Sequence, residues 1–208
     1  KEFKVWYKQN GTPLIKFQRY WDKDKKELKI EVSQSNEDKK NIYNNLPLII
    51  PIKIGIFLNK NELITKTIIL KEKKECFKFK NIKTSFTIPL ITYFREFSAP
   101  VKWQTDTSFS EKLLIIKNEK NYFTIYDTAK NIYKIIIQNR LNDRKDSLIE
   151  KEFIKTLGSI IRSKENINIS LLSELLTIPS FSDIEAEISN IDPLKIYRII
   201  DDLYYLFG

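Results

Sequence analysis

The spacing of apolar residues changes about halfway along this chain of 208 residues, and that change limits the folds open to it. In the first half apolar and polar residues alternate, as in the run Leu28–Val32. Alternation with a period of two is typical of a strand with one buried face. From about Glu111 the apolar residues recur every three to four positions, as on a helix with one buried face. We therefore predict two domains, an all-β domain over residues 1–104 and an all-α domain over residues 105–208.

Further apolar runs in the first half predict strands, and polar runs between them predict turns. The runs that favour strands are Thr12–Tyr20, Leu28–Val32, Ile52–Leu58, Phe77–Phe79 and Thr84–Phe94. Asp22–Lys26 and Asn59–Asn61 are short and polar, as hairpin turns are, and Ser35–Asn45 has the composition of a long surface loop. Several strands at close spacing, with no helical pattern between them, favour an antiparallel sandwich.

Apolar faces and capping signals place the helices of the second half. The apolar residues at helical spacing are Ile125, Ala129, Ile132, Tyr133 and Ile136, and then Phe153, Leu157, Ile160 and Ile161. Ser147 with Glu150, and Ser182 with Glu185, match the capping box that begins a helix. Asp192-Pro193 predicts an N-cap and a helix through about Leu206. The brief connections predict antiparallel neighbours, as in helical hairpins or a solenoid.

The last helix carries apolar residues on more than one face. They are Ile196, Ile199, Ile200, Leu203, Tyr204 and Phe207. Such a helix needs neighbours on two sides, and the chain offers few. The sequence also has no methionine, even at position 1. We therefore expect a truncated helical domain in a segment of a longer polypeptide. The alternative is a helix that ends at Gly208 and packs on the sandwich.

The chain has no histidine, and that absence excludes several classes of enzyme site. A H-E-x-x-H zinc site and a Ser-His-Asp triad both need imidazole. The single cysteine, Cys76, excludes an internal disulfide and is interpreted as a small packed side chain. The four glycines are isolated, so they form no phosphate-binding loop. The pairs Asp201-Asp202 and Glu185 with Glu187 diverge around a helix, which favours solvated surface over a metal site.

The formal net charge is +9, from 36 Lys and Arg against 27 Asp and Glu. The lysines are spread along the chain, which favours a solvated surface over a nucleic-acid site. Aromatic rings do occur among lysines near the start, at Trp6, Tyr7, Phe17, Tyr20 and Trp21, where they could stack on single-stranded nucleic acid. Core packing is the preferred interpretation, because alternate residues of a strand face the core. We find no membrane span or signal peptide and expect a cytoplasmic protein without a membrane partner.

Short motifs occur in one order along almost the whole chain. They are Trp6-Tyr7-Lys8-Gln9-Asn10-Gly11-Thr12-Pro13, Leu28–Gln34, Leu48–Ile52, Phe97-Ser98-Ala99-Pro100-Val101, Asn121-Tyr122-Phe123 followed by Tyr126-Asp127-Thr128-Ala129, Leu175-Leu176-Thr177-Ile178-Pro179-Ser180, and Ile191-Asp192-Pro193. The motif Phe97-Ser98-Ala99-Pro100-Val101 by itself predicts a buried edge segment with fixed geometry at the border of the two halves. Taken together, the motifs resemble the bacterial aminopeptidase N family, which are zinc aminopeptidases of the M1 family.

The resemblance covers the family's small Ig-like β-sandwich and the start of its large helical domain. It implies that the zinc ligands, the catalytic glutamate and the G-A-M-E-N motif lie upstream of Lys1. This chain would then hold no catalytic residue, no metal ligand and no cofactor of its own. Its partners would be the catalytic domain and the rest of the helical domain, and the parent enzyme would bind zinc and peptide substrates. The sandwich would brace the catalytic domain, and the helical domain would help to close the active-site cavity.

Two other functions are consistent with the same residues. One is an independent binding module for nucleic acid or protein, which would use the lysines and exposed rings. The other is the folded remnant of a split gene.

Overall fold

The structure is a computed structural model that describes residues 2–36, 41–58, 61–82, 88–144, 147–162, 168–185 and 192–207. The chain divides into two compact units, Lys1–Thr107 and Ser108–Gly208. Each unit has its own cluster of buried apolar side chains. The border between the units lies between residues 107 and 108. The change in apolar spacing predicted a border between residues 104 and 105.

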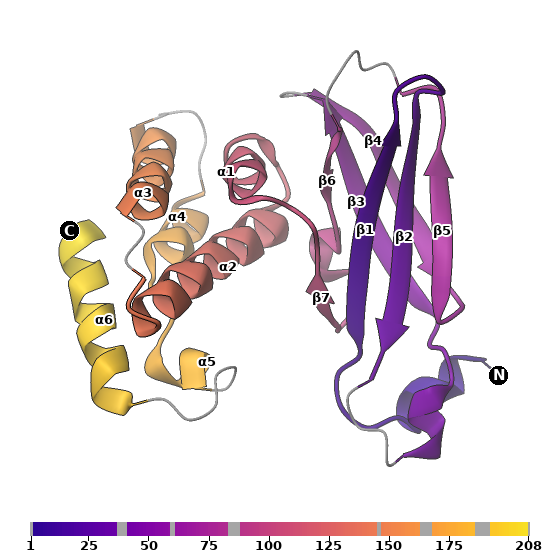
Figure 1. The fold of residues 1–208 in the computed structure, drawn as a ribbon, viewed down its shortest axis with the longest axis horizontal. Helices are drawn as coiled ribbons and strands as arrows, with labels where there is room; N and C mark the ends of the chain where they lie inside the picture. The colour runs from indigo at the N-terminus through magenta and orange to yellow at the C-terminus, as the bar shows by residue number, and fades with distance from the viewer. Residues whose placement is uncertain are drawn as a thin grey trace. The chain divides into compact units, whose positions relative to one another are not determined.

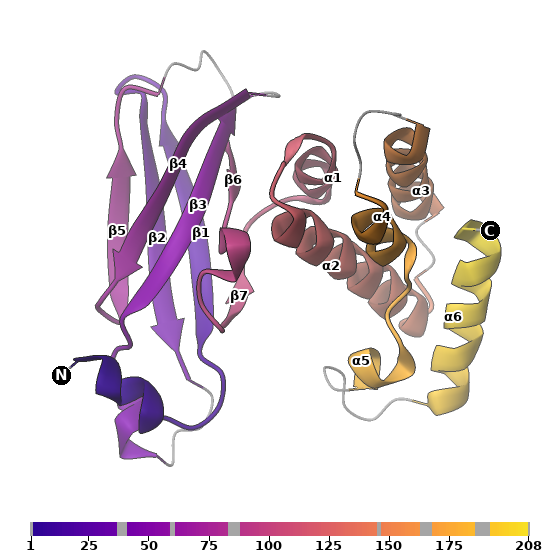
Figure 2. The same cartoon turned by 180° about the vertical axis from the view of Figure 1, so that it is seen from behind.

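In its described residues the first unit, called the Ig-like unit below, contains strands and three short 3-10 helices. Its elements are η1 (Glu2–Tyr7), β1 (Leu14–Asp22), β2 (Glu27–Ser35), η2 (Ile42–Asn45), β3 (Ile50–Leu58), β4 (Asn61–Leu70), β5 (Lys74–Phe79), β6 (Leu90–Thr92), η3 (Arg95–Phe97) and β7 (Lys102–Gln104). One sheet has the strand order β5-β2-β1-β7 and the other β4-β3-β6. The two sheets lie face to face, with β1 and β2 in front in Figure 1 and β3 and β4 in front in Figure 2.

The core between the two sheets follows the predicted alternation. Leu28, Ile30 and Val32 on β2 are fully buried, and so are Ile52 and Ile54 on β3. The predicted antiparallel sandwich has one exception at an edge, where β1 and β7 pair in parallel. The chain reaches β7 from β6 in the other sheet, and a strand that arrives by such a crossing need not oppose its neighbour.

Several predicted boundaries of the first unit shift or fall outside the described residues. The first strand is displaced by two residues, to Leu14–Asp22. The predicted loop 35–45 includes the short helix η2, and its residues 37–40 are outside the description. Residues 59–60 of the predicted hairpin turn and residues 83–87 of the last apolar run are also outside the description. The later part of that run contains β6 (Leu90–Thr92).

The second unit, called the helical unit below, consists of helices packed around one core. They are α1 (Phe109–Asn118), α2 (Tyr122–Leu141), α3 (Ser147–Arg162), α4 (Ile169–Leu176), α5 (Phe181–Glu185) and α6 (Pro193–Phe207). The predicted face of α2 is buried throughout, from Ile125 to Ile136. On α3 the prediction fails for Ile161, which is 47% exposed. Ile161 is turned by about 80° from Phe153, away from the arc that faces the core.

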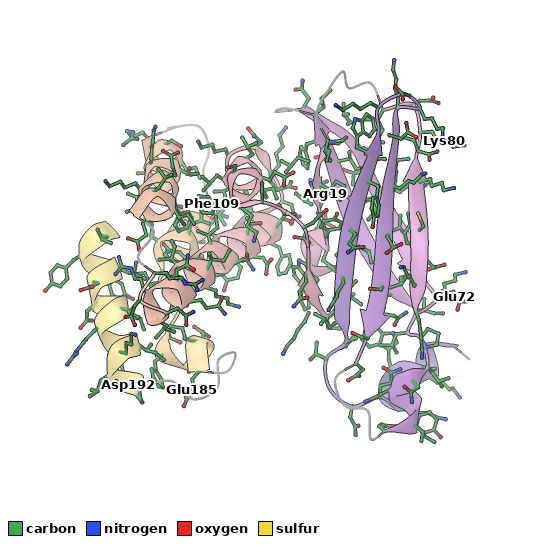
Figure 3. All side chains as sticks on the ribbon, in the orientation of Figure 1. Arg19, Glu72, Lys80, Phe109, Glu185 and Asp192 are labelled. Atoms are coloured by element: carbon green, nitrogen blue, oxygen red, sulfur yellow. The ribbon has the colours of Figure 1, made fainter. Side chains whose placement is uncertain are left out.

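The predicted start of the last helix is confirmed. Asp192 is its N-cap, because the Asp192 Oδ1 atom accepts a hydrogen bond of 2.9 Å from the backbone N–H of Leu194, and Pro193 is the first helical residue. Figure 3 shows Asp192 at this end of α6 and Glu185 at the end of α5. On α6, Ile196 and Leu203 are buried, whereas Tyr204 is 53% exposed.

The capping box predicted for α5 is wrong by two residues. The hydroxyl of Ser180 and the carboxylate of Asp183 form it, in place of Ser182 and Glu185. The hydroxyl and the backbone N–H of Ser180 hold the pKa of Asp183 below its usual value. For α3, the Ser147 side chain lies outside the described residues, and the carboxylate of Glu150 accepts hydrogen bonds from Arg140. That predicted box stays a prediction.

We expect Ser180→Ala to lower the free energy of unfolding of the helical unit by about 1 kcal/mol, because a helix N-cap is lost. Ser182→Ala is the matched control and is expected to change it by less than about 0.5 kcal/mol. Since the pKa of Asp183 is lowered in the folded state, its contribution is present above the usual aspartate pKa and is lost as the pH falls below it. Urea titrations followed by circular dichroism at two pH values measure both effects. Equal losses in the two variants would contradict the assignment of the cap.

Candidate interaction surfaces

The first sequence motif is fixed to the Ig-like unit by its own side chains. The indole Nε1 of Trp6 donates a hydrogen bond of 3.0 Å to the carbonyl oxygen of Ile49. The amide Nε2 of Gln9 donates to the carbonyl oxygens of Tyr43 and Leu46, both at 2.8 Å. Trp6 and Gln9 therefore hold η1 and the segment after it against η2 and the entry to β3.

The other residues of this motif divide into two groups. Gly11 has φ 78°, a left-handed backbone that favours glycine, and Pro13 is buried with its carbonyl oxygen accepting from the Lys102 N–H at 2.9 Å. Tyr7 and Thr12 are exposed, and Tyr7 is 86% exposed. Most of the motif thus shapes the backbone, whereas the Tyr7 ring is available to a partner.

A hollow of about 410 Å³ lies beside this motif. Amide side chains make up half of its lining, which comprises Gln9, Pro13, Gln34, Ser35, Asn36, Asn44, Asn45, Leu46, Pro47 and Lys73. The Gln34 amide bonds in three directions: Nε2 donates to the carbonyl oxygens of Leu48 and Glu72 at 2.9 Å, and Oε1 accepts from the Leu48 N–H at 2.8 Å. Such a lining can recognise polar groups, and it supplies no nucleophile with an adjacent general base.

The motif at the border of the two predicted halves is only partly buried. Ala99 and Val101 are buried, and the Ser98 hydroxyl accepts a hydrogen bond of 3.0 Å from the Lys53 N–H on β3. The expectation of a wholly buried segment is wrong for Phe97, which is 54% exposed, and for Pro100. The backbone of Phe97 is left-handed, with φ 54°, at a turn of the chain. Ser98 fixes this segment to the sheet.

Next to that motif lies a charge cluster around a buried arginine, which the sequence did not predict. The guanidinium of Arg95 forms a bidentate ion pair with Glu62, in which Nη1 is 3.0 Å from Oε1 and Nη2 is 3.0 Å from Oε2. Nη1 also donates to the Thr65 hydroxyl at 2.7 Å. Arg95 is only 7% exposed. The cluster ties the segment after β6 to the first half of β4.

Space for the Arg95 guanidinium comes from Gly55 on β3. A Cβ atom at Gly55 would lie 2.8 Å from the Thr92 Oγ1 and 3.0 Å from the Arg95 Nη1. Phe94 and Glu96, on either side of Arg95, have φ 51° and 59°. Two left-handed residues thus turn the chain back over the outer face of β3. A glycine inside a strand signals a close approach of this kind, and this is the one sequence sign of the cluster.

In the helical unit the residues of the resemblance motifs serve mainly in packing. Ala129 is 1% exposed and Pro179 is buried. Asp127 is half-buried on α2. Burial lowers the pKa of Lys112, and the charge of Asp127 opposes that shift. Asp192 begins α6.

A buried ion pair, also missed by the sequence reasoning, connects three helices of this unit. Arg140 on α2 binds Glu150 on α3 with Nε 2.7 Å from Oε1 and Nη2 2.9 Å from Oε2. Asp202 on α6 lies 3.5 Å from Arg140 Nη1. The hydrogen bond to Glu150 raises the pKa of Arg140. The three residues are far apart in the sequence and share no period, so no pattern could indicate their contact.

The proposed stacking platform retains only two freely exposed rings. Phe17 lies in the core, 3% exposed, with its ring centroid 4.0 Å from that of Tyr93. Trp6 and Trp21 are half-buried, whereas Tyr7 and Tyr20 are exposed. The preferred interpretation, core packing, is thus correct for Phe17.

The prediction that Cys76 is packed is wrong, because its side chain is exposed. Cys76 lies on β5, an edge strand, opposite Glu31 of β2. It points to the outer face, since its neighbours Phe77 and Phe79 take the inner positions. Its place in the alternation of β5 therefore decides its exposure.

Neither a metal site nor a membrane span occurs in the described part of the chain. No group of three or more His, Cys, Asp or Glu side chains there could hold a metal ion. None of the described helices is both long enough and apolar enough to cross a bilayer.

Two family models match the chain one after the other. A domain of unknown function with an Ig-like fold (DUF3458) matches residues 11–106, and a domain of unknown function with ARM repeats (DUF3458_C) matches residues 110–206. Aminopeptidase N of Haemophilus influenzae is 24% identical to the chain over 204 residues, which is 92% of the chain. The chain resembles aminopeptidase N along most of its length.

Further members of the aminopeptidase N family match over similar lengths. The Escherichia coli protein is 22% identical over 97% of the chain, and the Caulobacter vibrioides protein is 23% identical over 95%. The chain spans about a quarter of the length of these relatives, between 23% and 24%. A crystal structure of Legionella pneumophila aminopeptidase A in complex with aspartic acid matches 98% of the chain with a TM-score of 0.79 at 22% identity, which shows a shared fold.

These matches confirm the resemblance on which the sequence analysis relied. They also confirm the predicted fold class, an Ig-like sandwich followed by helical repeats. The chain is thus similar to a C-terminal segment of aminopeptidase N.

Proposed function

We propose that this chain is the non-catalytic C-terminal segment of a zinc-dependent aminopeptidase that releases N-terminal amino acids from peptides. The supporting observation is that similarity to aminopeptidase N extends through both units, over 92–97% of the chain, yet covers only about a quarter of each relative. The rest of such a protein would supply the catalytic domain and the remainder of the helical domain. A cytoplasmic location is part of this proposal.

Zinc in this proposal belongs to the catalytic domain. The donors present in this chain do not suit the ion, because the sequence has no histidine and the described residues form no cluster of three potential ligands. In this proposal the zinc ligands and the catalytic groups lie outside these 208 residues. The part of this chain in the activity would be to position other domains.

The Ig-like unit has the internal cross-links that a brace needs. Arg19 on β1 binds Asp106 after β7 in two ways: its Nε atom lies 2.6 Å from Oδ1, and its backbone N–H donates to Oδ2 at 3.1 Å. Arg19 lies on the side of the unit where this segment runs (Figure 3). These bonds hold the last residues of the unit on the sheet, and a fixed exit supports a bracing role.

Exposed apolar side chains support contact with further domains. In the Ig-like unit Tyr7 and Ile42 are 86% and 75% exposed, and on α6 Tyr205 is 89% exposed. Large apolar groups that gather on a surface mark sites of association. We propose that the first pair faces the catalytic domain and that α6 contacts the rest of the helical domain, which would help to close the active-site cavity.

The coding sequence upstream of Lys1 and the activity of the full-length product test this proposal. We expect an open frame that encodes G-A-M-E-N and H-E-x-x-H, and a purified product that cleaves aminoacyl-p-nitroanilides until a zinc chelator is added. The 208-residue chain alone is the control and should release no product. A stop codon next to Lys1, or a full-length product without peptidase activity, would contradict the proposal. Salt-dependent binding of oligonucleotides by the chain would then favour the independent binding module.

A further inference from the structure

An apolar patch lies at one end of the Ig-like unit, outside its core. Tyr7, Ile42, Tyr43 and Leu46 are 86%, 75%, 36% and 47% exposed, and we call these four residues the corner patch. Tyr7 comes from η1, and the other three come from η2 and the residue after it. Figure 1 shows the two short helices side by side at the end of the sandwich nearest the N label.

Hydrogen bonds hold the corner patch in place. Besides the bonds from Gln9 to the carbonyl oxygens of Tyr43 and Leu46, the Asn41 Nδ2 donates to the Lys8 carbonyl oxygen at 2.8 Å. The Asn10 N–H donates to the Asn44 Oδ1 at 3.1 Å. The Lys8 ammonium lies 4.8 Å from the centre of the Tyr43 ring. The patch is therefore preorganised, which lowers the entropy cost of binding a partner.

The amide-lined hollow adjoins the corner patch, since Leu46 belongs to both and Gln9 lines the hollow. An apolar centre beside a polar margin is the usual composition of a protein interface. Tyrosine is among the residues that contribute most to binding energy at such interfaces. Exposed lysines surround the patch: Lys4 and Lys8 lie on its η1 side and Lys73 in the hollow.

We propose that the corner patch is the docking site for the catalytic domain encoded before Lys1, with Tyr7 and Tyr43 as its anchors. This inference rests on the proposed function. The chain spans about a quarter of its relatives' length, and polypeptide before Lys1 would join at η1, within the patch. A domain tethered at this point has a high effective concentration for the patch.

The charge around the patch defines the partner surface. Its complement is an apolar pocket rimmed by carboxylates, because Lys4, Lys8 and Lys73 supply positive charge. A second copy of this chain fits less well. Two-fold pairing of identical patches would bring Lys4 and Lys8 of both copies together, and like charges at an interface are costly.

A photo-crosslinking amino acid in the full-length product tests the docking site directly. Placed at position 42, it should give adducts within one molecule to peptides encoded before Lys1. Placed at position 63, where Leu63 is 42% exposed on β4, it should give none to those peptides. Adducts from position 42 to a second copy, or only to peptides of these 208 residues, would overturn the inference.

A pair of substitutions provides a second readout. Ile42→Asp and the matched control Ile69→Asp, at a residue 39% exposed on β4, should give the 208-residue chain similar thermal midpoints. In the full-length enzyme we expect Ile42→Asp alone to shorten the half-life of peptidase activity at raised temperature, by about tenfold. Equal half-lives for the two variants of an active enzyme would overturn the docking site and leave the proposed function intact. Crosslinks from position 42 to an upstream domain without peptidase activity would support the docking site and refute the proposed function, and the absence of any upstream domain would overturn both.

Discussion

Replacing Arg140 with methionine is expected to lower the free energy of unfolding of the helical unit by about 3–5 kcal/mol. The Arg140 and Glu150 side chains are only 6% and 8% exposed, and two hydrogen bonds join them. Methionine fills similar space without charge, so the Glu150 carboxylate would be left buried with no counter-ion. The cost of such an uncompensated charge exceeds the net contribution of the pair itself.

The double variant Arg140→Met with Glu150→Leu separates these two effects. It removes both charges, and we expect it to regain most of the lost stability because no ion stays unpaired. Asp202→Asn is the control for the third member, and since Asp202 is 69% exposed its effect should be below about 1 kcal/mol. Urea unfolding followed by circular dichroism at 222 nm measures all three. If Arg140→Met were as stable as the double variant, the Glu150 carboxylate would have to be solvated or paired by other groups.

Substituting alanine for Gly55 is expected to destabilise the Ig-like unit by about 2–3 kcal/mol, the upper range for overpacking. The new Cβ would lie 2.8 Å from Thr92 Oγ1 and 3.0 Å from both Arg95 Nη1 and Phe57 Cε2. Thr92 and Arg95 are buried, and Glu62 holds the guanidinium at two atoms. Either β3 moves or the ion pair opens, and both cost stability.

Gly158→Ala in α3 is the matched control for this substitution. The nearest atom to its Cβ would be Arg162 Nη1, at 3.3 Å, the end of an exposed side chain. Alanine in a helix is favoured over glycine by up to about 1 kcal/mol, so this variant should be unchanged or more stable. The three tryptophans, Trp6, Trp21 and Trp103, all belong to the Ig-like unit. Their fluorescence therefore reports the effect of Gly55→Ala there, and circular dichroism reports Gly158→Ala in the helices.

The local patterns of the sequence were sufficient for most of the secondary structure. The alternation in Leu28–Val32 and the helical spacing from Ile125 to Ile136 both predicted the buried faces that the structure contains. Asp192-Pro193 predicted the start of α6. Each of these signals lies within one strand or one helix. Because one face of the element is buried, apolar residues recur along it at a fixed period. Ser180 and Ser182 both match the capping pattern at the start of α5, and the pattern predicted the wrong one of the two as the cap.

Of the candidate interaction surfaces, the sequence predicted only part. It singled out Tyr7 but interpreted Ser35–Asn45 as a polar loop, although Ile42, Tyr43 and Leu46 lie in or next to that segment. Gln9 brings these residues to Tyr7 through two hydrogen bonds to backbone carbonyl oxygens. A carbonyl oxygen is common to every residue, so its use as a partner leaves no mark in the sequence.

The sequence by itself determined that this chain has an all-β half and an all-α half, that it holds no histidine-based site, and which family it resembles. Only the tertiary structure decided the parallel pairing of β1 with β7, the exposure of Phe97 and Cys76, and the ion pairs of Arg95 and Arg140. The physical reason is distance along the chain. Periodicity and capping depend on neighbours within a few residues, whereas Arg95 meets Glu62 and Arg140 meets Asp202 only after the backbone has folded.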